Sequence, residues 1–236
     1  MRVALMRPLG EAERSAALLR ARGFEPVLAP VMANHGTGIE PPGAPFDAVL
    51  ATSANAFGFL SPDACGRLRG LPLHVAGERT AEAARAVGLG PAEDACADAS
   101  ALAAATAARL ERPSRLLYLA GRDRKSGLEA ALRSAGHELT AVEVYVAEAR
   151  AWSAAEVAGV AACGAALHYS RRSAELSIAL CAEASLTEHW RATLHGCISP
   201  DAAEPLRSIG AERIVTAPRA QESSLIDALS SASTTG

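Results

Sequence analysis

Residues 20–32, RARGFEPVLAPVM, and residues 133–145, RSAGHELTAVEVY, carry the pattern that decides the fold. Four identities recur between them at a spacing of 113, namely Arg20 and Arg133, Gly23 and Gly136, Glu25 and Glu138, and Val31 and Val144. Each stretch ends an Ala- and Leu-rich amphipathic segment, turns at a glycine and continues as an apolar strand. The chain therefore contains one strand–helix–strand unit twice, and the copies differ at their ends, Met32 and Tyr145.

The repeat continues in three further blocks, in the same order and with slowly growing offsets. They are residues 46–57 with 163–174 at a spacing of 117, residues 75–88 with 197–210 at 122, and Ser100 and Leu102 with Ser223 and Leu225 at 123. Apolar strand patterns alternate with helical patterns in both copies, which favours parallel sheets covered by helices on both faces. We predict an α/β protein with two small doubly wound domains.

The composition is that of a globular chain without a general basic surface. Of the 236 residues, 50% are hydrophobic and 21% are charged, and the net charge is −3. This balance argues against binding of nucleic acid or anionic lipid, and an aromatic content of 4% argues against stacking on single-stranded nucleic acid. The N-terminal apolar stretch is too short for a signal peptide and no apolar run approaches membrane-spanning length, so we expect a cytoplasmic protein.

Several classes of catalytic site lack their sequence motifs. The chain has 22 Arg and a single Lys, Lys125, so a Schiff base would have to form at that residue. The five cysteines show no C-x-x-C motif and are expected to be buried thiols. The six histidines show no metal-ligand spacing, so we expect no metal site. A dinucleotide fingerprint, a P-loop and a nucleophile elbow are also missing.

Hydroxyl groups and arginines recur where the predicted strands end. They occur at Arg7 and in the segments TSAN (52–55), GERT (77–80), GRDRK (121–125), YSRRS (169–173) and SPD (199–201). Each Ser or Thr is first of all expected to cap a helix, and each Arg taken alone is consistent with a solvated charge. Ligands of open α/β sheets bind at this edge, where helix N-termini and arginines favour anions. The whole set therefore predicts an acidic small molecule bound in a cleft between the domains.

Tyr145 differs from the other candidates because it ends the second repeated strand and is one of only three tyrosines. A buried tyrosine most often hydrogen-bonds a neighbour and has no further role. The alternative is a phenolic proton donor that faces the cleft.

With these segments in place, the chain resembles the uroporphyrinogen-III synthase family. The resemblance rests on an ordered set that spans nearly the whole chain, namely RP after the first strand, TSANA, VAGERTAEAARAVG, LYLAGRDR, VEVYVA and YSRRSA. The family fold implies two flavodoxin-like parallel-sheet domains joined by a two-stranded linker. The expected boundaries are a domain from 1–33 and 149–236, a domain from 46–142, and linkers at 34–45 and 143–148.

The resemblance implies a cofactor-free, cyclising hydro-lyase of porphyrin and heme biosynthesis. The family's substrate is hydroxymethylbilane, a linear tetrapyrrole with acetate and propionate side chains. Its terminal hydroxyl leaves as water, and closure through a spiro intermediate inverts the last ring to give uroporphyrinogen III. Because closure without inversion is spontaneous, such an enzyme acts mainly by orienting the chain. The resemblance and the position of Tyr145 make this residue the expected donor to the leaving hydroxide.

Eight further residues are expected to bind the substrate: Arg7, Ser53, Asn55, Thr80, Arg122, Ser170, Arg171 and Ser199. Thr80 matches the family threonine of a glycine-x-x-threonine turn, and the resemblance implies that it binds a carboxylate or a water. Its repeat partner is Ala202, and Ser199 replaces the usual glycine, so this second turn offers only backbone amides. Met6 replaces a threonine that is common in the family.

Two alternatives stay open. One is a non-catalytic two-domain module that binds tetrapyrroles or other acidic ligands, and the other is a degenerate relative that has lost activity. The negative net charge and the lack of a helix-turn-helix segment disfavour a sensor linked to DNA binding. We expect a monomer with no nucleic-acid or membrane partner, and a transient contact with the preceding pathway enzyme stays open as well.

Overall fold

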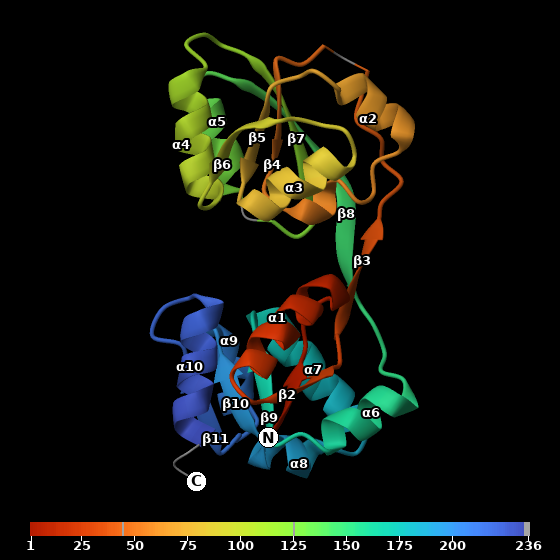
Figure 1. Cartoon of the computed structure of the whole chain (residues 1–236), viewed down its shortest axis with the longest axis vertical. Coiled ribbons are helices and arrows are strands. Elements are labelled where there is room, and N and C mark those ends of the chain that lie inside the picture. Colours follow the sequence, from red (N-terminus) through yellow and green to blue (C-terminus); the bar gives the residue numbers. More distant parts are fainter. Residues whose placement is uncertain (44, 125, 234–236) are drawn as a thin grey trace. The chain divides into compact units, whose positions relative to one another are not determined.

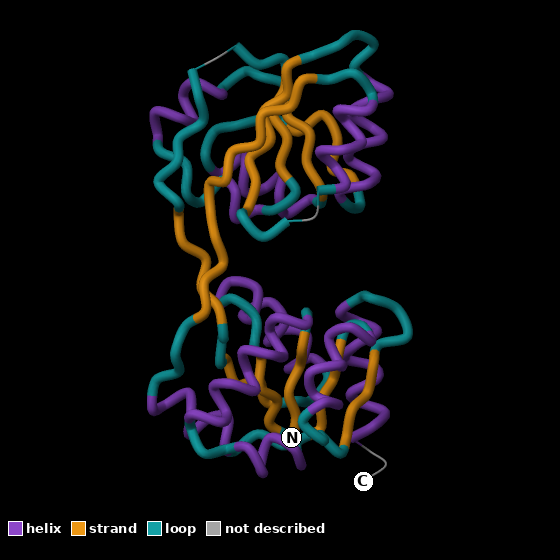
Figure 2. Tube along the Cα trace, turned by 180° about the vertical axis from the view of Figure 1, so that it is seen from behind, coloured by secondary structure: helices purple, strands orange, loops and turns teal. Residues whose placement is uncertain are grey.

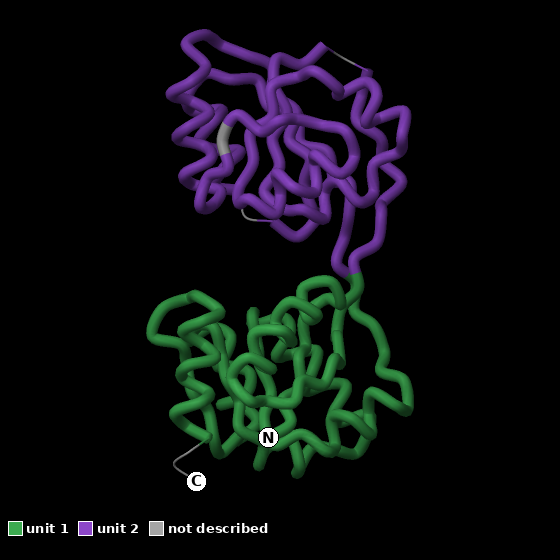
Figure 3. Tube along the Cα trace, viewed as in Figure 1, with its two compact units in different colours: residues 1–33, 148–236 green, residues 34–147 purple. Residues whose placement is uncertain are grey.

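The computed structural model describes residues 1–43, 45–124 and 126–233, without the side chain of Asp94. The chain divides into two compact units, which are unit 1 (Met1–Ala33 and Glu148–Gly236) and unit 2 (Asn34–Ala147), as Figure 3 shows. Each unit is a sheet with helices packed against both of its faces (Figure 1).

Unit 1 is built on a five-stranded parallel sheet with the order β11-β10-β9-β1-β2. Its strands are β1 (Arg2–Leu5), β2 (Glu25–Leu28), β9 (Ala165–His168), β10 (Leu194–Cys197) and β11 (Arg213–Thr216). Its helices are α1 (Leu9–Ala21), α6 (Ala154–Ala161), α7 (Arg171–Glu183), α8 (Thr187–Ala192), α9 (Pro200–Ser208) and α10 (Glu222–Ser233). Helices α1 and α10 cover one face, and α7 and α9 pack together on the other (Figure 1). Counted within the unit, the order is 2-1-3-4-5, as in flavodoxin-like folds.

Unit 2 contains a six-stranded sheet with the order β3-β8-β7-β4-β5-β6. Its strands are β3 (Met32–Gly36), β4 (Ala48–Ala51), β5 (Leu73–Ala76), β6 (Ala92–Cys96), β7 (Arg115–Gly121) and β8 (Glu138–Ala149). Its helices are the 3₁₀ turn η1 (Ala54–Ala56), α2 (Pro62–Leu68), α3 (Glu78–Ala86), α4 (Ala99–Arg109) and α5 (Gly127–Ser134). The strands from β8 to β6 pair in parallel, and β3 adds to the β8 edge.

The two parallel sheets have the same strand order once the repeat is taken into account. By sequence offset, β1 and β2 correspond to β7 and β8, whereas β9, β10 and β11 correspond to β4, β5 and β6. Equivalent pairs occupy equivalent registers, namely Arg2 with Glu25 and Arg115 with Glu138, and Val3 with Ala165 and Leu116 with Ala48. The predicted α/β class and duplication are confirmed. Each unit combines the opening strand–helix–strand of one copy with the later strands of the other.

Both copies end their first helix at a glycine, as predicted. Gly23 and Gly136 have φ angles of 78° and 88°, a region that is strained for residues with a side chain. The following amides, of Phe24 and His137, each donate to the carbonyl five residues earlier at 3.1 Å. This closure satisfies the last carbonyls of the helix, so the chain enters β2 and β8 in the same way.

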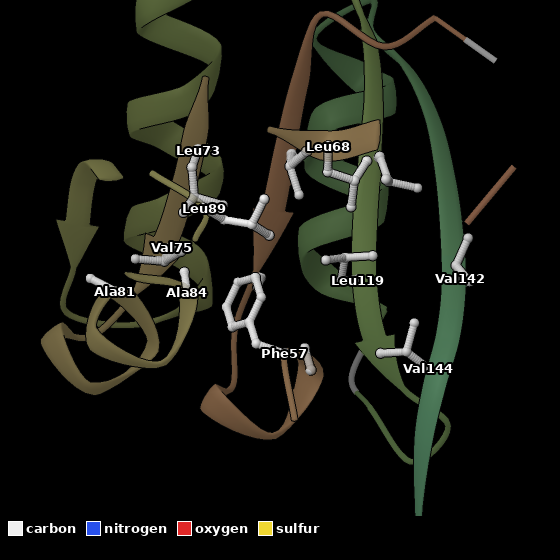
Figure 4. Close-up of a cluster of buried hydrophobic side chains, with 14 residues drawn as sticks. Phe57, Leu68, Leu73, Val75, Ala81, Ala84, Leu89, Leu119, Val142 and Val144 are labelled. Carbon is white, nitrogen blue, oxygen red and sulfur yellow. The ribbon is translucent and has the colours of Figure 1, made fainter. Parts of the chain in front are cut away.

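The central strands β4 and β7 of unit 2 are buried on both faces, which explains their continuous apolar runs. Leu117 and Leu119 of β7 pack with Phe57 and helices α2 and α3 in the cluster that Figure 4 shows. The alternate residues Leu116 and Tyr118 point to the opposite face and pack with α4 and α5. All five of these side chains are 0–2% exposed. The run LLYL thus supplies both layers of the core at once.

β3 and β8 lie side by side (Figure 2), and their hydrogen bonds show that they run antiparallel. The Thr37 amide donates to the Val144 carbonyl at 3.2 Å, and the Arg150 amide donates to the Val31 carbonyl at 3.1 Å. Residue numbers therefore rise along one strand as they fall along the other. The unit boundaries fall inside these two strands. The two segments that we expected as linkers thus include hydrogen-bonded strand, because each backbone satisfies the other's polar groups.

Candidate functional site

Tyr145 lies on β8 beside the last residue of β7. The parallel ladder between the two strands shifts register between Ala120 and Gly121, so that Gly121 pairs with Tyr145 and Val144 is passed over. The Arg122 amide then donates to the Tyr145 carbonyl at 2.9 Å. Such an irregularity re-aims the side chains that follow it. The register shift therefore determines where Tyr145 sits at the carboxyl end of β7.

The hydroxyl of Tyr145 differs from those of the other two tyrosines. Tyr118 shares a hydrogen bond of 2.8 Å with the hydroxyl of Thr52, and Tyr169 donates to Glu222 at 2.6 Å. Within residues 1–43, 45–124 and 126–233, the Tyr145 hydroxyl makes no hydrogen bond. Its ring is half-buried against the unit 2 core and stacks on Phe59. The hydroxyls of Tyr118 and Tyr169 thus follow the ordinary structural role of hydrogen-bonding a neighbour.

Arg122 and Arg124 flank Tyr145 through a shared carboxylate, Glu143. Arg122 Nε donates to Glu143 at 3.3 Å, and Arg124 contacts Glu143 at 3.0 Å and Glu129 at 2.7 Å. Hydrogen bonding to Arg124 holds the pKa of Glu143 below its ordinary value. The side chain of Arg122 is 52% exposed, whereas that of Arg124 is 20% exposed. Arg122 thus retains guanidinium N–H groups that face solvent.

The segment after β4 has two local hydrogen bonds. Ser53 caps η1 by accepting from the Asn55 amide at 3.3 Å. Thr52 anchors the start of this turn on Tyr118, whose pKa is raised by burial although the bond to Thr52 lowers it. The predicted capping role of Ser53 is confirmed. Ser53 and Asn55 themselves are half-buried at the carboxyl end of β4.

Thr80 lies in the first turn of α3, after the helix N-cap Gly77. Its side chain is buried, and its hydroxyl donates to the Ala76 carbonyl at 2.6 Å. The N-cap Gly77 has a φ of 83°, which lets β5 turn directly into the helix. Because the Thr80 proton is already used, this turn presents mainly the unpaired amides of the helix N-terminus to an anion.

In unit 1, Arg7 follows β1 and is held by carboxylates of the same unit. It contacts Glu11 at 2.8 Å and Glu222 at 3.2 Å, and its guanidinium lies 4.0 Å from the ring centroid of Tyr169. Ser15 also donates to Glu222. Burial lowers the pKa of Arg7, but the two carboxylates raise it above its ordinary value. Burial and the bond to Glu222 likewise raise the pKa of Tyr169.

The remaining predicted residues of unit 1 cap or bridge helices. Ser170 caps α7 in a capping box with Ser173, and Ser199 caps α9 by accepting from the Ala202 amide at 3.3 Å. Arg171 is 50% exposed and pairs with Glu175 at 2.9 Å and more loosely with α9. The capping predictions are confirmed, and the amides at both helix N-termini are the groups left for a ligand.

The structure groups the predicted residues by unit. Tyr145, Arg122, Ser53, Asn55 and Thr80 belong to unit 2, and Arg7, Ser170, Arg171 and Ser199 to unit 1. Within unit 2 the edge combines a phenol whose hydroxyl makes no hydrogen bond to a described residue, a half-exposed guanidinium and helix N-terminal amides. These groups can donate a proton and bind an anion.

The described residues contain no candidate metal site. In the described part of the chain, no group of three or more His, Cys, Asp or Glu side chains could hold a metal ion. Lys125 lies outside the described residues. All five cysteines are free and four are buried. Among the helices of the described residues, none has the length and apolar character needed to cross a membrane.

Sequence reasoning missed several residues that shape these edges. They are Phe59, Tyr118, Glu143 and Glu222; Tyr169 was included in a predicted edge segment, but its hydroxyl was given no role. Glu222 reaches Arg7 across 215 residues of chain, so no local pattern could have identified it. Tyr118 stands in the apolar run LLYL, where a single polar atom in a buried strand was the available signal.

Comparisons with known proteins show which family this geometry belongs to. A family model described as "Uroporphyrinogen-III synthase HemD" matches residues 13–227, which is most of the chain. None of the curated proteins compared with the chain matches it.

Solved structures resemble the chain over its whole length. A uroporphyrinogen-III synthetase from Helicobacter pylori is 15% identical, with 98% of this chain and 99% of that chain covered and a TM-score of 0.64. A mutant uroporphyrinogen III synthase from Thermus thermophilus is 19% identical, with both chains fully covered (100% each) and a TM-score of 0.53. At such identities the likeness shows a shared fold.

Proposed function

The chain belongs to the uroporphyrinogen-III synthase family, and on this premise we propose that it closes hydroxymethylbilane into uroporphyrinogen III with Tyr145 as the proton donor. The family reaction breaks the bond between the terminal hydroxymethyl carbon and its oxygen. The phenol gives its proton to the leaving hydroxide, so water departs. Ring closure releases one proton from a pyrrole carbon, which restores the phenol and balances the reaction. No cofactor enters this scheme.

One observation carries the assignment of Tyr145. Among the three tyrosines, its hydroxyl is the one that makes no hydrogen bond to a described residue, whereas Tyr118 and Tyr169 are bound to Thr52 and Glu222. A donor must be free to reach the substrate, and a hydroxyl that is already bound would first have to give up its partner. Tyr145 is also half-buried, which limits competition from water.

We further propose that the substrate carboxylates bind to backbone amides and half-exposed arginines. Arg122 and Arg171 have side chains 52% and 50% exposed, which leaves N–H groups for a ligand. The turns that begin with Ser53, Ser170 and Ser199 add helix N-terminal amides. The turn of Thr80 contributes in the same way. Arg7 is paired with Glu11 and Glu222 in this structure, so it binds a substrate carboxylate only after releasing one of these two partners.

The product of the purified protein tests the activity. Hydroxymethylbilane generated in a coupled reaction is converted, oxidised and separated by chromatography into type I and type III porphyrins. We expect type III to dominate with the protein and type I to dominate without it. If type III does not rise above the control, the activity is refuted. Binding of hydroxymethylbilane without type III formation would favour the non-catalytic alternative.

Tyr145→Phe tests the donor. The variant keeps the ring and loses the proton, so we expect the rate of type III formation to fall about 10²-fold with little change in KM. Tyr169→Phe is the matched control, because it also removes one tyrosine hydroxyl from a sheet edge. An unchanged rate in Tyr145→Phe would return this residue to a structural role. We also propose that the protein is cytoplasmic and acts as a monomer. Gel filtration of the active protein tests its oligomeric state.

A further inference from the structure

The ring of Tyr145 is bordered by two residues that leave it little freedom. Phe59 stacks on it with ring centroids 6.3 Å apart and planes 22° apart. Gly121 approaches it so closely that a Cβ atom at this position would lie 2.6 Å from Cζ and 2.8 Å from Oη of Tyr145. Phe59 in turn packs against Gly36 of β3, where a Cβ atom would lie 3.1 Å from the Phe59 ring. Two glycines thus flank a pair of aromatic rings.

Backbone conformation does not require a glycine at either place. Neither Gly36 nor Gly121 is among the residues with positive φ, so any residue could adopt their backbone angles. What a side chain would disturb at these positions is the aromatic ring beside it. A side chain at Gly121 would displace the phenol, and a side chain at Gly36 would push Phe59 toward it. The two glycines therefore make room for Phe59 and Tyr145.

Phe59 is not explained as a core residue. It is 38% exposed and follows η1 in the loop that leads to α2, whereas Phe57, two residues earlier, is 1% exposed inside the core. Burial of a partly exposed aromatic side chain stabilises the fold less than burial of a core one. We therefore look to the stacking contact with Tyr145 for the role of Phe59.

The Tyr145 hydroxyl has no hydrogen bond to a described residue, so only its backbone and ring contacts set the direction of the phenol. We propose that Phe59 is a positioning residue that, together with Gly121, fixes the Tyr145 ring in the orientation from which the phenol delivers its proton. This inference rests on the proposed donor role of Tyr145. Orientation matters because a small displacement of a reacting group costs far more in rate than in binding.

Phe59→Leu removes the aromatic stack and keeps an apolar side chain of similar size. We expect kcat for type III formation to fall about tenfold while KM changes little, because the ring of Tyr145 loses its stacking partner. Phe59→Tyr restores the stack and should restore the rate. Phe24→Leu, at a half-buried phenylalanine of unit 1, is the matched control and should leave the rate unchanged.

Gly121→Ala tests the other border. Its methyl group would occupy the space of the phenol, so we expect kcat to fall about as far as in Tyr145→Phe. Gly66→Ala is the control within unit 2, since a Cβ atom there meets nothing within 4 Å. Circular dichroism of each variant verifies that it is folded.

A double-mutant cycle separates positioning from an independent effect. If Phe59 acts through Tyr145, Phe59→Leu should cause no further loss in the Tyr145→Phe background. Losses that multiply would overturn the inference, because Phe59 would then act without the phenol. An unchanged kcat in Phe59→Leu would overturn it as well.

A second readout does not depend on activity. With 3-fluorotyrosine in place of tyrosine, the protein gives three ¹⁹F resonances, which the three Tyr→Phe variants assign. Phe59→Leu should shift the Tyr145 resonance and leave those of Tyr118 and Tyr169 in place, and a Tyr145 resonance that does not move would overturn the inference. If Tyr145→Phe leaves the rate unchanged while this resonance moves, the proposed donor role fails and the positioning of the ring stands.

Discussion

Tyr169 of unit 1 and Tyr145 of unit 2 both lie at the edge where the parallel strands of their sheets end, yet their hydroxyl groups are in opposite situations. Tyr169 donates to Glu222 and lies under the guanidinium of Arg7, within a network of charges. Tyr145 is held by ring contacts and its backbone. A phenol that is bound to a carboxylate stabilises a fold, whereas a phenol that is positioned but unbound can act on a ligand. The edges of the two units thus differ in how their tyrosine hydroxyls are held.

The same difference separates the two arginines that follow the first strand of each copy. Arg7 is 18% exposed and is paired with two carboxylates, whereas Arg122 is 52% exposed and makes one weaker contact with Glu143. A largely buried charge needs oppositely charged partners, because their attraction offsets the free-energy cost of removing the charge from water. An exposed pair is worth little and is easily exchanged for a ligand.

Arg7→Met should therefore have the largest effect on stability. It leaves Glu11 and Glu222 without their guanidinium, and we expect the free energy of unfolding of unit 1 to fall by about 3 kcal/mol. Arg122→Met should cost less than about 1 kcal/mol and should instead raise KM for hydroxymethylbilane. Both tryptophans, Trp152 and Trp190, belong to unit 1, so tryptophan fluorescence during urea unfolding measures the effect of Arg7→Met. Arg122 lies in unit 2, so far-UV circular dichroism in urea measures the effect of Arg122→Met. Equal losses of stability in the two variants would contradict the contrast.

Acid should destabilise unit 1 through a buried histidine pair. His195 Nε2–H donates to the Trp190 carbonyl at 2.7 Å, so its Nδ1 accepts from His168 Nε2–H at 3.1 Å, and both rings are neutral. Burial lowers the pKa of His168 well below its ordinary value and that of His195 to about 4. The unfolded chain, with ordinary histidine pKa values near 6.5, therefore takes up protons before the folded chain does.

Stability from this pair is present above pH 6.5 and is lost as the pH falls toward 4. For His195 alone the loss is about 3 kcal/mol at the lower pH, from a pKa that falls from 6.5 to about 4. Urea unfolding followed by the fluorescence of Trp190, whose ring lies 4.9 Å from that of His195, measures it. His195→Gln should flatten the dependence between pH 6.5 and 4. A wild-type stability that stays level over this range would contradict the expectation.

The smallest expected difference is between the stability losses caused by removing the hydroxyls of Tyr169 and Tyr118, the two tyrosines with hydrogen-bonded side chains. Tyr169→Phe removes a donor to a carboxylate, so we expect unit 1 to lose about 2 kcal/mol of unfolding free energy. Tyr118→Phe removes a neutral bond to Thr52, and we expect about 1 kcal/mol from unit 2. Far-UV circular dichroism in urea follows both units. A larger loss from Tyr118→Phe would reverse the order of the two edges.

Much of the fold could be predicted from local patterns. The glycine stops at Gly23 and Gly136 follow from the amphipathic segments that they end, and the caps at Ser53, Ser170 and Ser199 follow from hydroxyl residues that stand between strand and helix patterns. These features depend on a few neighbouring residues and on the backbone angles that each residue type allows.

The candidate site could be predicted only in part. The position of Tyr145 at the end of a repeated strand made it a candidate, but its contacts with Phe59 and Gly121 depend on how β8 pairs with β7. Arg7 was expected to face a ligand, and the structure pairs it with Glu222 from the far end of the chain. Residue type alone does not say which charge a side chain will meet.

Sequence periodicity and the offsets of 113, 117 and 122 thus account for the two copies, their class and the order of their elements, because hydrophobic spacing and glycine turns act over a few residues. Only the tertiary structure decides that each unit combines strands from both copies, that the ladder shifts register opposite Tyr145, and that Arg7 pairs with Glu222. These depend on which strands become neighbours, and that choice is made by burial of both sheet faces at once rather than by any single segment.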